Sequence, residues 1–261
     1  MNKMTKKYFF FDIDDTLTDR STGKVVPSAL EALQKLREAG HFVAIATGRA
    51  HYKAIHFMKE NGFDNMVCNG GHGIVFNGEL VENKGLDFEK AFAVYQEARD
   101  LGYGIYTAVD DSNKVYTNDF LFHEQVGMRK EPSVYIIDQD FDPRNFEEIF
   151  KMYVAVPEKE EKLLKSKEAI GHLRFEKEYL MFQPDAKLAG IYRLLEIAGA
   201  DTQDVVVFGD GRNDIDMFDD HFYRIAMGNA CPELKELADY ITDTNINDGI
   251  MKACIEHNWW C

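Results

Sequence analysis

Three aspartates lie within four positions directly after a short aromatic run near the start of the chain. The run is Tyr8–Phe11, and Asp12, Asp14 and Asp15 follow it. An apolar run of this length between charged residues predicts a buried strand. Asp12 and Asp14 would then lie at the carboxyl edge of that strand, where open α/β sheets bind ligands. Neighbouring carboxylates repel each other unless a cation such as Mg²⁺ neutralises them. An acidic turn without a ligand is the alternative for this segment taken alone.

A second strand-like run also ends in acidic residues. Val205–Phe208 is followed by the loop Gly209–Asp214, in which glycines flank Asp210 and allow close approach of the backbone to a ligand. Asn213 and Asp214 have an alternative role, because either could cap a following helix. Capping does not explain Asp210. The two loops together offer three or four oxygen ligands, which is the set expected for Mg²⁺.

Two further segments could bind an anion. Thr47, Gly48 and Arg49 follow the strand-like run His41–Ala46, and a hydroxyl with free backbone amides at a helix N-terminus forms an anion site. For Thr47 alone, a simple helix cap is as good an explanation. Lys187 begins a predicted helix, and a solvated surface position is the ordinary role of a single lysine. Its importance depends on the larger pattern.

The elements that must position these segments alternate between strand and helix at both ends of the chain. The strands are predicted at Tyr8–Phe11, His41–Ala46, Asn65–Cys68 and Val205–Phe208, and the helices at Pro27 to Gly40, Ala50–Asn61 and Lys187–Ala198, with another helix beginning near Asn213. This alternation predicts right-handed crossovers and a parallel sheet. Asn77-Gly78, between two strand-like runs, predicts a β-hairpin.

The middle of the chain has a different pattern. Aromatic-rich strands and helices follow one another there without strict alternation, which is typical of an α+β module. The predicted elements are helices at Phe88–Leu101 and around Phe146, strands at Tyr103–Val109, Val134–Ile137 and Met152–Val156, and a hairpin of His172–Phe175 and Tyr179–Phe182. We therefore predict one discontinuous domain, residues 1–83 and 184–261, interrupted by an inserted domain, residues 84–183.

Composition restricts the partners. The 261 residues carry a formal net charge of −15, which disfavours nucleic acid and anionic membrane surfaces. An anionic substrate would need a metal ion and local basic groups. The four cysteines are scattered, and neither a membrane span nor a signal peptide is recognisable, so we expect a soluble cytoplasmic protein. The sequence fits a monomer and a homodimer equally.

Taken in order, these motifs resemble those of the haloacid-dehalogenase-like (HAD) hydrolase superfamily, and within it the Cof-type phosphatases with a large inserted cap. The matching segments are Asp12–Thr16, Thr47, Lys187 and Gly209–Asp214, with further similarity at Asn69–Gly71 and Met227–Ala230. Two positions depart from the family pattern. Asp15 stands where glycine is common, and Leu188 stands where a glycine usually follows the lysine.

The resemblance implies a Rossmann-like α/β core with an inserted α+β cap, and phosphate-ester hydrolysis through an aspartyl-phosphate. Asp12 would be the nucleophile, and Asp14 the general acid and base. The implied Mg²⁺ ligands are Asp12, Asp14 through its backbone carbonyl, Asp210 and Asp214. Thr47 and Lys187 would stabilise the transferred phosphoryl group, and the implied substrate-binding residues are Thr47, Gly48, Arg49, Lys187 and Asn213.

We therefore expect an Mg²⁺-dependent phosphatase acting on a small phosphorylated metabolite, such as a sugar phosphate or a phosphorylated cofactor. One alternative is a phosphomutase or phosphotransferase on the same scaffold. Another is a non-catalytic sensor of a phosphorylated metabolite, which the presence of both Asp12 and Asp14 disfavours. A dinucleotide oxidoreductase is disfavoured because no Gly-x-Gly-x-x-Gly follows the first strand.

Overall fold

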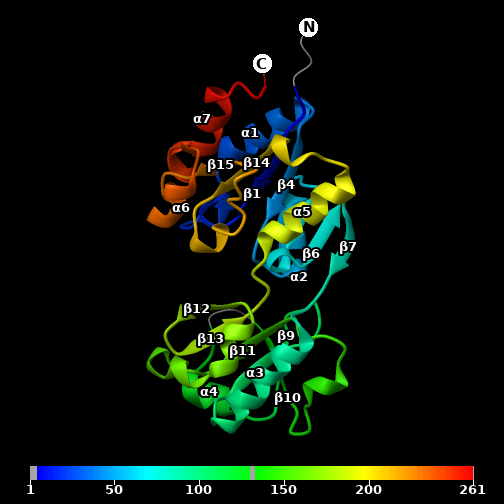
Figure 1. Cartoon of the computed structure of the whole chain (residues 1–261), viewed down its shortest axis with the longest axis vertical. Helices are drawn as coiled ribbons and strands as arrows, with labels where there is room; N and C mark the ends of the chain where they lie inside the picture. The colour runs from blue at the N-terminus through cyan, green and yellow to red at the C-terminus, as the bar shows by residue number, and fades with distance from the viewer. Residues whose placement is uncertain (1–4, 130–132, 261) are drawn as a thin grey trace. The chain divides into compact units, whose positions relative to one another are not determined.

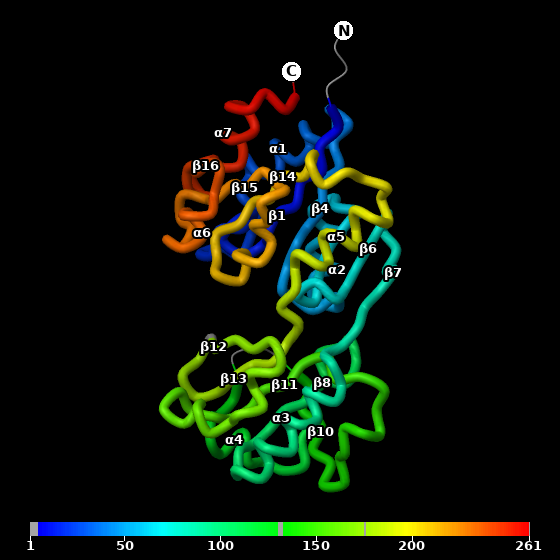
Figure 2. The backbone as a smooth tube through the Cα atoms, viewed as in Figure 1, coloured from blue at the N-terminus to red at the C-terminus, as the bar shows by residue number. Residues whose placement is uncertain are grey.

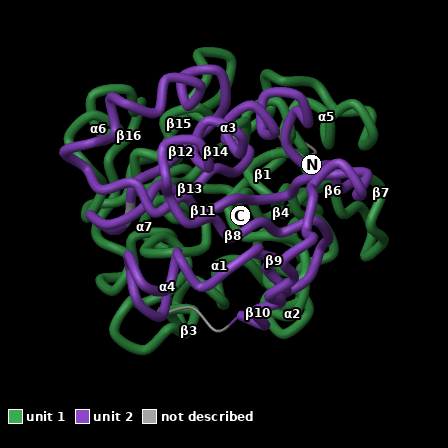
Figure 3. The backbone as a smooth tube through the Cα atoms, turned by 90° about the horizontal axis from the view of Figure 1, so that it is seen from below, with its two compact units in different colours: residues 1–82, 186–261 green, residues 83–185 purple. Residues whose placement is uncertain are grey.

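The computed structural model describes residues 5–129 and 133–260. The chain forms two compact units, drawn in different colours in Figure 3. Unit 1 comprises Met1–Glu82 and Ala186–Cys261, and unit 2 comprises Asn83–Asp185. Two segments that are far apart in the sequence therefore build unit 1, as the blue and red ends of the chain in Figure 1 illustrate.

Unit 1 is built on one sheet. Within the described residues it has eight strands in the order β16-β15-β14-β1-β4-β5-β6-β7. Their bounds are β1 Tyr8–Phe11, β4 Phe42–Ala46, β5 Met66–Cys68, β6 Gly73–Phe76, β7 Glu79–Asn83, β14 Val205–Gly209, β15 Tyr223–Ala226 and β16 Tyr240–Ile241. The strands from β16 to β5 pair in parallel, and β6 pairs antiparallel to β5. The predicted Rossmann-like parallel core is confirmed.

Strand β1 lies in the middle of this sheet and is buried on both faces. Phe9 and Phe11 belong to one apolar cluster and Phe10 to the other, because successive side chains of a strand point to opposite faces. Helices cover both clusters: α1 (Pro27–Glu38), α2 (His51–Glu60) and α7 (Gly249–Glu256) contribute to the first, and α5 (Lys187–Ala198) and α6 (Pro232–Leu237) to the second. An aromatic run without polar alternation is what a doubly covered strand requires.

At the edge of the sheet beyond β5, strands β6 and β7 form a tight hairpin. Asn77 and Gly78 join β6 to β7 and both have positive φ, 50° and 81°. Two such residues form a type I′ turn, whose twist matches that of the flanking strands. The predicted hairpin is confirmed. A separate small ribbon, β2 (Thr18–Asp19) with β3 (Lys24–Val25), follows the first acidic loop.

Unit 2 has a sheet of its own, whose path is followed most easily in Figure 2. Its described strands are ordered β10-β9-β8-β11-β13-β12. Their bounds are β8 Ile105–Ala108, β9 Lys114–Thr117, β10 Val134–Ile137, β11 Lys151–Val154, β12 His172–Glu176 and β13 Tyr179–Phe182. The helices are α3 (Phe88–Asp100) and α4 (Leu121–Val126). Within the described residues, mostly antiparallel pairing with two α-helices makes unit 2 an α+β unit, as predicted.

The helix predicted around Phe146 is wrong. A short 3₁₀ turn, Pro143–Asn145, ends there, and Phe146 itself is extended, with φ −121° and ψ 152°. The carboxylate of Asp142 accepts the N–H of Arg144 and so favours a turn over a longer helix. The aromatic ring of Phe146 packs against Phe141 instead. No helix within the described residues is long and apolar enough to cross a membrane.

Candidate active site

The two acidic loops meet at the carboxyl ends of adjacent strands. Phe11 of β1 and Phe208 of β14 are paired in register, and the N–H of Asp12 donates to the carbonyl of Phe208 at 3.1 Å. This pairing brings Asp12 next to the loop that carries Asp210 and Asp214. One carboxylate oxygen from each of these three residues lies within 4.8 Å of the others. The predicted clustering of acids from both loops is present in the structure.

Lys187 lies buried between two of these carboxylates. Its Nζ donates to Oδ1 of Asp12 and to Oδ1 of Asp214, both at 2.6 Å, and only 1% of its side chain is exposed. Lysine is almost never this buried unless it is paired. Burial lowers the pKa of Lys187, but the charges of Asp12 and Asp214 outweigh burial and raise it. Lys187 is therefore a buried ammonium and not a solvated surface residue.

Two neighbouring segments fix the chain that leads into Lys187. The N–H of Ala186 donates to the carbonyl of Gly70 at 2.7 Å, and the N–H of Leu188 donates to Oδ2 of Asp216 at 2.8 Å. Gly71 makes the first contact possible. Its φ is +101°, and a Cβ at this position would lie 1.9 Å from the carbonyl oxygen of Ala186. The Asn69–Gly71 turn thus positions the lysine, a role that the sequence similarity did not reveal.

Asp214 holds the second acidic loop together. Its Oδ2 accepts the backbone N–H groups of Asp210 at 3.0 Å and Gly211 at 2.9 Å, while Oδ1 accepts the lysine. The segment Arg212–Asp214 forms a 3₁₀ turn, so the helix predicted near Asn213 is confined to this turn. Asp214 is completely buried and ties the loop to Lys187.

Asp210 receives a hydrogen bond from the first loop. The hydroxyl of Thr16 donates to its Oδ1 at 2.7 Å, across 194 positions of sequence. Thr16 belongs to the first motif but was given no role of its own by the sequence. The contact orients Asp210 toward the same cluster as Asp12.

The cluster contains more acidic groups than basic ones. Burial, followed by the charge of Asp214, raises the pKa of Asp12 to about 8, even though Lys187 acts in the opposite direction. Burial also raises the pKa of Asp210 to about 7. Three carboxylates face one ammonium, so ionisation of all three needs additional positive charge. Carboxylate oxygens grouped in this way are suitable ligands for Mg²⁺, and the donor set fits the predicted metal.

Asp14 lies outside this buried cluster. Its side chain is 63% exposed and accepts two hydrogen bonds from Arg49, at 3.0 Å from Nε and 2.5 Å from Nη2. Arg49 follows Thr47 and Gly48 at the end of β4. Thr47 is 1% exposed, and its hydroxyl accepts the N–H of Arg49 at 3.2 Å. Helix α2 has Ala50 as its N-cap residue, so Thr47 is not the cap of that helix.

The two remaining predicted binding residues, Gly48 and Asn213, are both half-buried. Gly48 lies between Thr47 and Arg49. Asn213 lies in the turn before Asp214, where a Cβ at Gly211 would come within 2.4 Å of its Oδ1. The glycine thus makes room for the asparagine side chain.

One of the two residues that depart from the family pattern, Asp15, adopts a left-handed conformation with φ 62°. Aspartate tolerates this region better than most residues, so it can replace the usual glycine. The side-chain amide of Asn229 donates to the carbonyl of Asp15 at 2.8 Å, and the buried Asn245 donates to the carbonyl of Thr18 at 2.7 Å. The two asparagines anchor the loop from the C-terminal part of unit 1.

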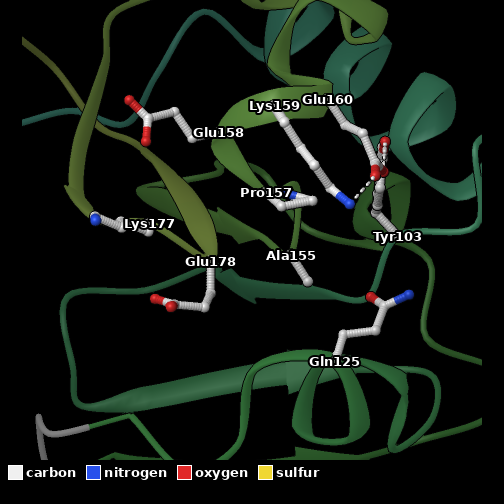
Figure 4. Close-up of a pocket in the computed structure, with 9 residues that line it drawn as sticks. All are labelled: Tyr103, Gln125, Ala155, Pro157, Glu158, Lys159, Glu160, Lys177 and Glu178. Carbon is white, nitrogen blue, oxygen red and sulfur yellow. Dashed lines mark hydrogen bonds and ion pairs between the residues drawn. The ribbon is translucent and has the colours of Figure 1, made fainter.

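A pocket of about 510 Å³ lies entirely within unit 2 (Figure 4). Two of its polar side chains bind neighbours: the hydroxyl of Tyr103 donates to Glu160 at 3.1 Å, and Gln125 binds the backbone of Gly102 and Gly104. None of the residues predicted from sequence to act in catalysis or binding lines it. The candidate active site is the carboxylate cluster of unit 1.

Comparison with known proteins identifies the family that this sheet, cluster and order of motifs define. The chain belongs to the haloacid dehalogenase-like hydrolases, whose family model matches residues 9–254. A relative in Bacillus subtilis (strain 168), YkrA, named as a candidate phosphatase, is 28% identical over 97% of this chain and 98% of its own. The phosphoglycolate phosphatase of Methanothermobacter thermautotrophicus is 26% identical over 95% and 97%.

Solved structures agree with this assignment. A protein of Geobacillus kaustophilus HTA426 superposes with a TM-score of 0.81 at 28% identity, covering 98% of this chain and 100% of that one. The subclass IIB sugar phosphatase BT4131 gives a TM-score of 0.77 at 25% identity, with 97% and 100% covered. The chain is therefore a HAD-like phosphatase, and the family resemblance seen in the motifs is confirmed.

Proposed function

We propose that this phosphatase is Mg²⁺-dependent and hydrolyses a small phosphorylated metabolite through an aspartyl-phosphate on Asp12. The observation that carries the proposal is the convergence of three carboxylates at the carboxyl edge of the sheet, two of which bind the buried ammonium of Lys187. In this proposal residues 1–83 and 184–261 form the catalytic core, and residues 84–183 form a cap that selects the leaving group.

Asp12 acts as the nucleophile. One of its carboxylate oxygens attacks phosphorus, and the bond between phosphorus and the ester oxygen breaks. Asp14 donates a proton to the departing oxygen, so that an alcohol leaves. The same carboxylate then takes a proton from water as that water attacks the phosphorus of the aspartyl-phosphate. Inorganic phosphate and the original Asp12 carboxylate are the products.

Asp12, Asp210, Asp214 and the backbone carbonyl of Asp14 would hold Mg²⁺. The ion supplies the positive charge that lets an anionic nucleophile and an anionic phosphate come together. Lys187 has three N–H donors, two of which bind carboxylates in the structure, so the third is available for a phosphoryl oxygen.

Backbone and side-chain donors complete the phosphate site in this proposal. Thr47 and Gly48 offer a hydroxyl and a backbone N–H at the end of β4. The side chain of Asn213, in the second acidic loop, would be a further contact to the phosphate. Donors that are fixed in place before the reaction stabilise charge as it develops on the phosphoryl oxygens.

The relatives suggest which substrates to test. BT4131 is a sugar phosphatase, and YwtE of Bacillus subtilis (strain 168), 26% identical over 94% of this chain and 95% of its own, is named for 5-amino-6-(5-phospho-D-ribitylamino)uracil. We propose sugar phosphates and phosphorylated cofactors or their precursors as the substrate class. Phosphoglycolate, from the name of the Methanothermobacter relative, belongs in the same panel.

The test is phosphate release from this panel and from p-nitrophenyl phosphate, with Mg²⁺ and with EDTA. Release that requires Mg²⁺ and that Asp12→Asn abolishes supports the proposal. Asp100→Asn, at the exposed end of α3, is the matched control and should stay active. Turnover in folded Asp12→Asn protein would refute the nucleophile, and isomerisation of a sugar phosphate without phosphate release would favour a mutase.

A further inference from the structure

Arg49 and Asp14 form a forked pair whose geometry has a consequence for the reaction. Nε of Arg49 donates to Oδ2 of Asp14, and Nη2 donates to Oδ1. Each oxygen of the carboxylate therefore binds its own nitrogen of the planar guanidinium. A pair of this kind fixes the plane of the carboxylate as well as its position.

Asp14 needs such a partner more than the other acids of the site. Asp12 and Asp214 are buried and held by Lys187, whereas the Asp14 side chain is 63% exposed and is not part of the buried carboxylate cluster. An exposed aspartate samples several rotamers when nothing restrains it. The only hydrogen bonds to its carboxylate within the described residues come from Arg49.

Arg49 is itself held at three points. Its N–H donates to the hydroxyl of Thr47 at 3.2 Å, and its carbonyl accepts the N–H of Asn69 at 2.7 Å. Its guanidinium lies over the ring of Phe57 in α2, 5.4 Å from the ring centre. The restraint on Asp14 is therefore transmitted from the ends of β4 and β5 and from α2.

The fork leaves part of the carboxylate free. A carboxylate oxygen has two lone pairs, and Arg49 occupies one on each oxygen. The other lone pair on each oxygen is free to carry the proton that a general acid transfers. Arg49 can thus hold Asp14 in place without occupying the positions that proton transfer uses.

We propose that Arg49 is a positioning residue that fixes the Asp14 carboxyl group for proton transfer to the leaving oxygen. This inference rests on the proposed function, in which Asp14 is the general acid. This role can be distinguished from direct binding of the phosphoryl group by Arg49. If Arg49 acts through Asp14, the effect of removing it on the rate depends on how much the leaving group needs a proton.

Two esters separate these roles. An alkyl phosphate such as a hexose 6-phosphate needs a proton on its leaving oxygen, whereas p-nitrophenolate leaves as an anion. The ratio kcat/KM reports the steps up to phosphoryl transfer to Asp12, before water attacks. Loss of a well-placed general acid costs on the order of 10²–10⁴ in rate, and misplacing a catalytic group by about 1 Å costs up to about 10². We expect Arg49→Ala to lower kcat/KM for the alkyl ester by up to about 10²-fold and to change it little for p-nitrophenyl phosphate.

Four further variants make the test specific. Asp14→Asn should show the same dependence on the leaving group, and adding Arg49→Ala to it should cost nothing more, because Arg49 acts through Asp14. Arg49→Lys should restore only part of the lost rate, because an ammonium cannot form the fork. Arg224→Ala removes a similar forked pair, with Asp239, in β15 and should leave the ratio between the two esters unchanged.

Equal losses with both esters, or additive losses in the double variant, would overturn the positioning role. A rise in KM for both esters with unchanged kcat would likewise show that Arg49 binds the phosphoryl group directly. Failure of the proposed function would look different, since the wild-type protein would then release phosphate from neither ester.

Discussion

Replacing Lys187 by methionine tests whether the lysine balances the buried carboxylates. Methionine keeps the length of the side chain and removes the ammonium, so Asp12 and Asp214 lose hydrogen bonds of 2.6 Å. Removing one partner of a buried ion pair costs about 3–5 kcal/mol. With the lysine in place the pKa of Asp12 is about 8, so at neutral pH this carboxyl already holds most of its proton and loses mainly a hydrogen bond when the ammonium is removed. We therefore expect a loss near the lower end, about 3 kcal/mol.

The assay is urea unfolding in EDTA, in which about 3 kcal/mol lowers the midpoint by about 1–2 M. The matched control is Lys252→Met in α7, which removes an ion pair with Asp243 of similar length, 2.7 Å, on a side chain that is 51% exposed. A surface pair contributes about 0–1 kcal/mol, so the control should barely change the midpoint. Phosphate release by Lys187→Met should fall on the order of 10²–10³-fold.

Equal unfolding midpoints for the two variants would refute this reasoning, because the carboxylates would then be stable without the ammonium. Retained activity in a destabilised variant would show that the lysine has a structural role only and does not bind the phosphate.

Two further perturbations probe the same site. In EDTA the free energy of unfolding should fall as pH rises from about 5 to 8. Folded Asp12 and Asp210, with pKa values of about 8 and about 7, hold protons in this range that the unfolded chain has already released near 3.8. The slope approaches about 1.4 kcal/mol per pH unit for each group. Mg²⁺ should flatten this dependence, and a free energy of unfolding that rises in EDTA over this range would contradict the assignment. Gly71→Ala should lower both stability and phosphate release, because its Cβ would meet the carbonyl of Ala186, whereas Gly78→Ala, with positive φ and open space, should cost only about 1–2 kcal/mol of stability. Equal activity in the two glycine variants would show that the contact with Ala186 does not position the lysine.

The parts of the fold that follow from local pattern were predictable from the sequence. The aromatic run before Asp12 and the β-branched run before Asp210 read as buried strands because both faces of each are covered. Asn77-Gly78 was recognisable as a turn because few other residue pairs adopt two positive φ angles. Lys187 was placed correctly at the start of its helix.

Other features depend on contacts between distant residues, which no local pattern contains. Lys187 is buried because the Asn69–Gly71 turn binds the backbone of Ala186, the residue just before the lysine. The pairing of Arg49 with Asp14 joins the ends of two neighbouring strands. The segment around Phe146 has helical composition, but the ring of Phe146 packs against Phe141, and a short turn forms at Pro143 instead of a helix.

The place of β1 in the sheet has a consequence for the order in which the chain folds. Its two neighbours are β4, about 30 positions away, and β14, about 200 positions away. Contacts between such distant segments close large loops and form late. A growing polypeptide therefore exposes one edge of its most aromatic strand until Val205–Gly209 has been synthesised. We expect the carboxylate cluster to assemble in the same late step, so that any chain ending before this strand is inactive and prone to aggregate.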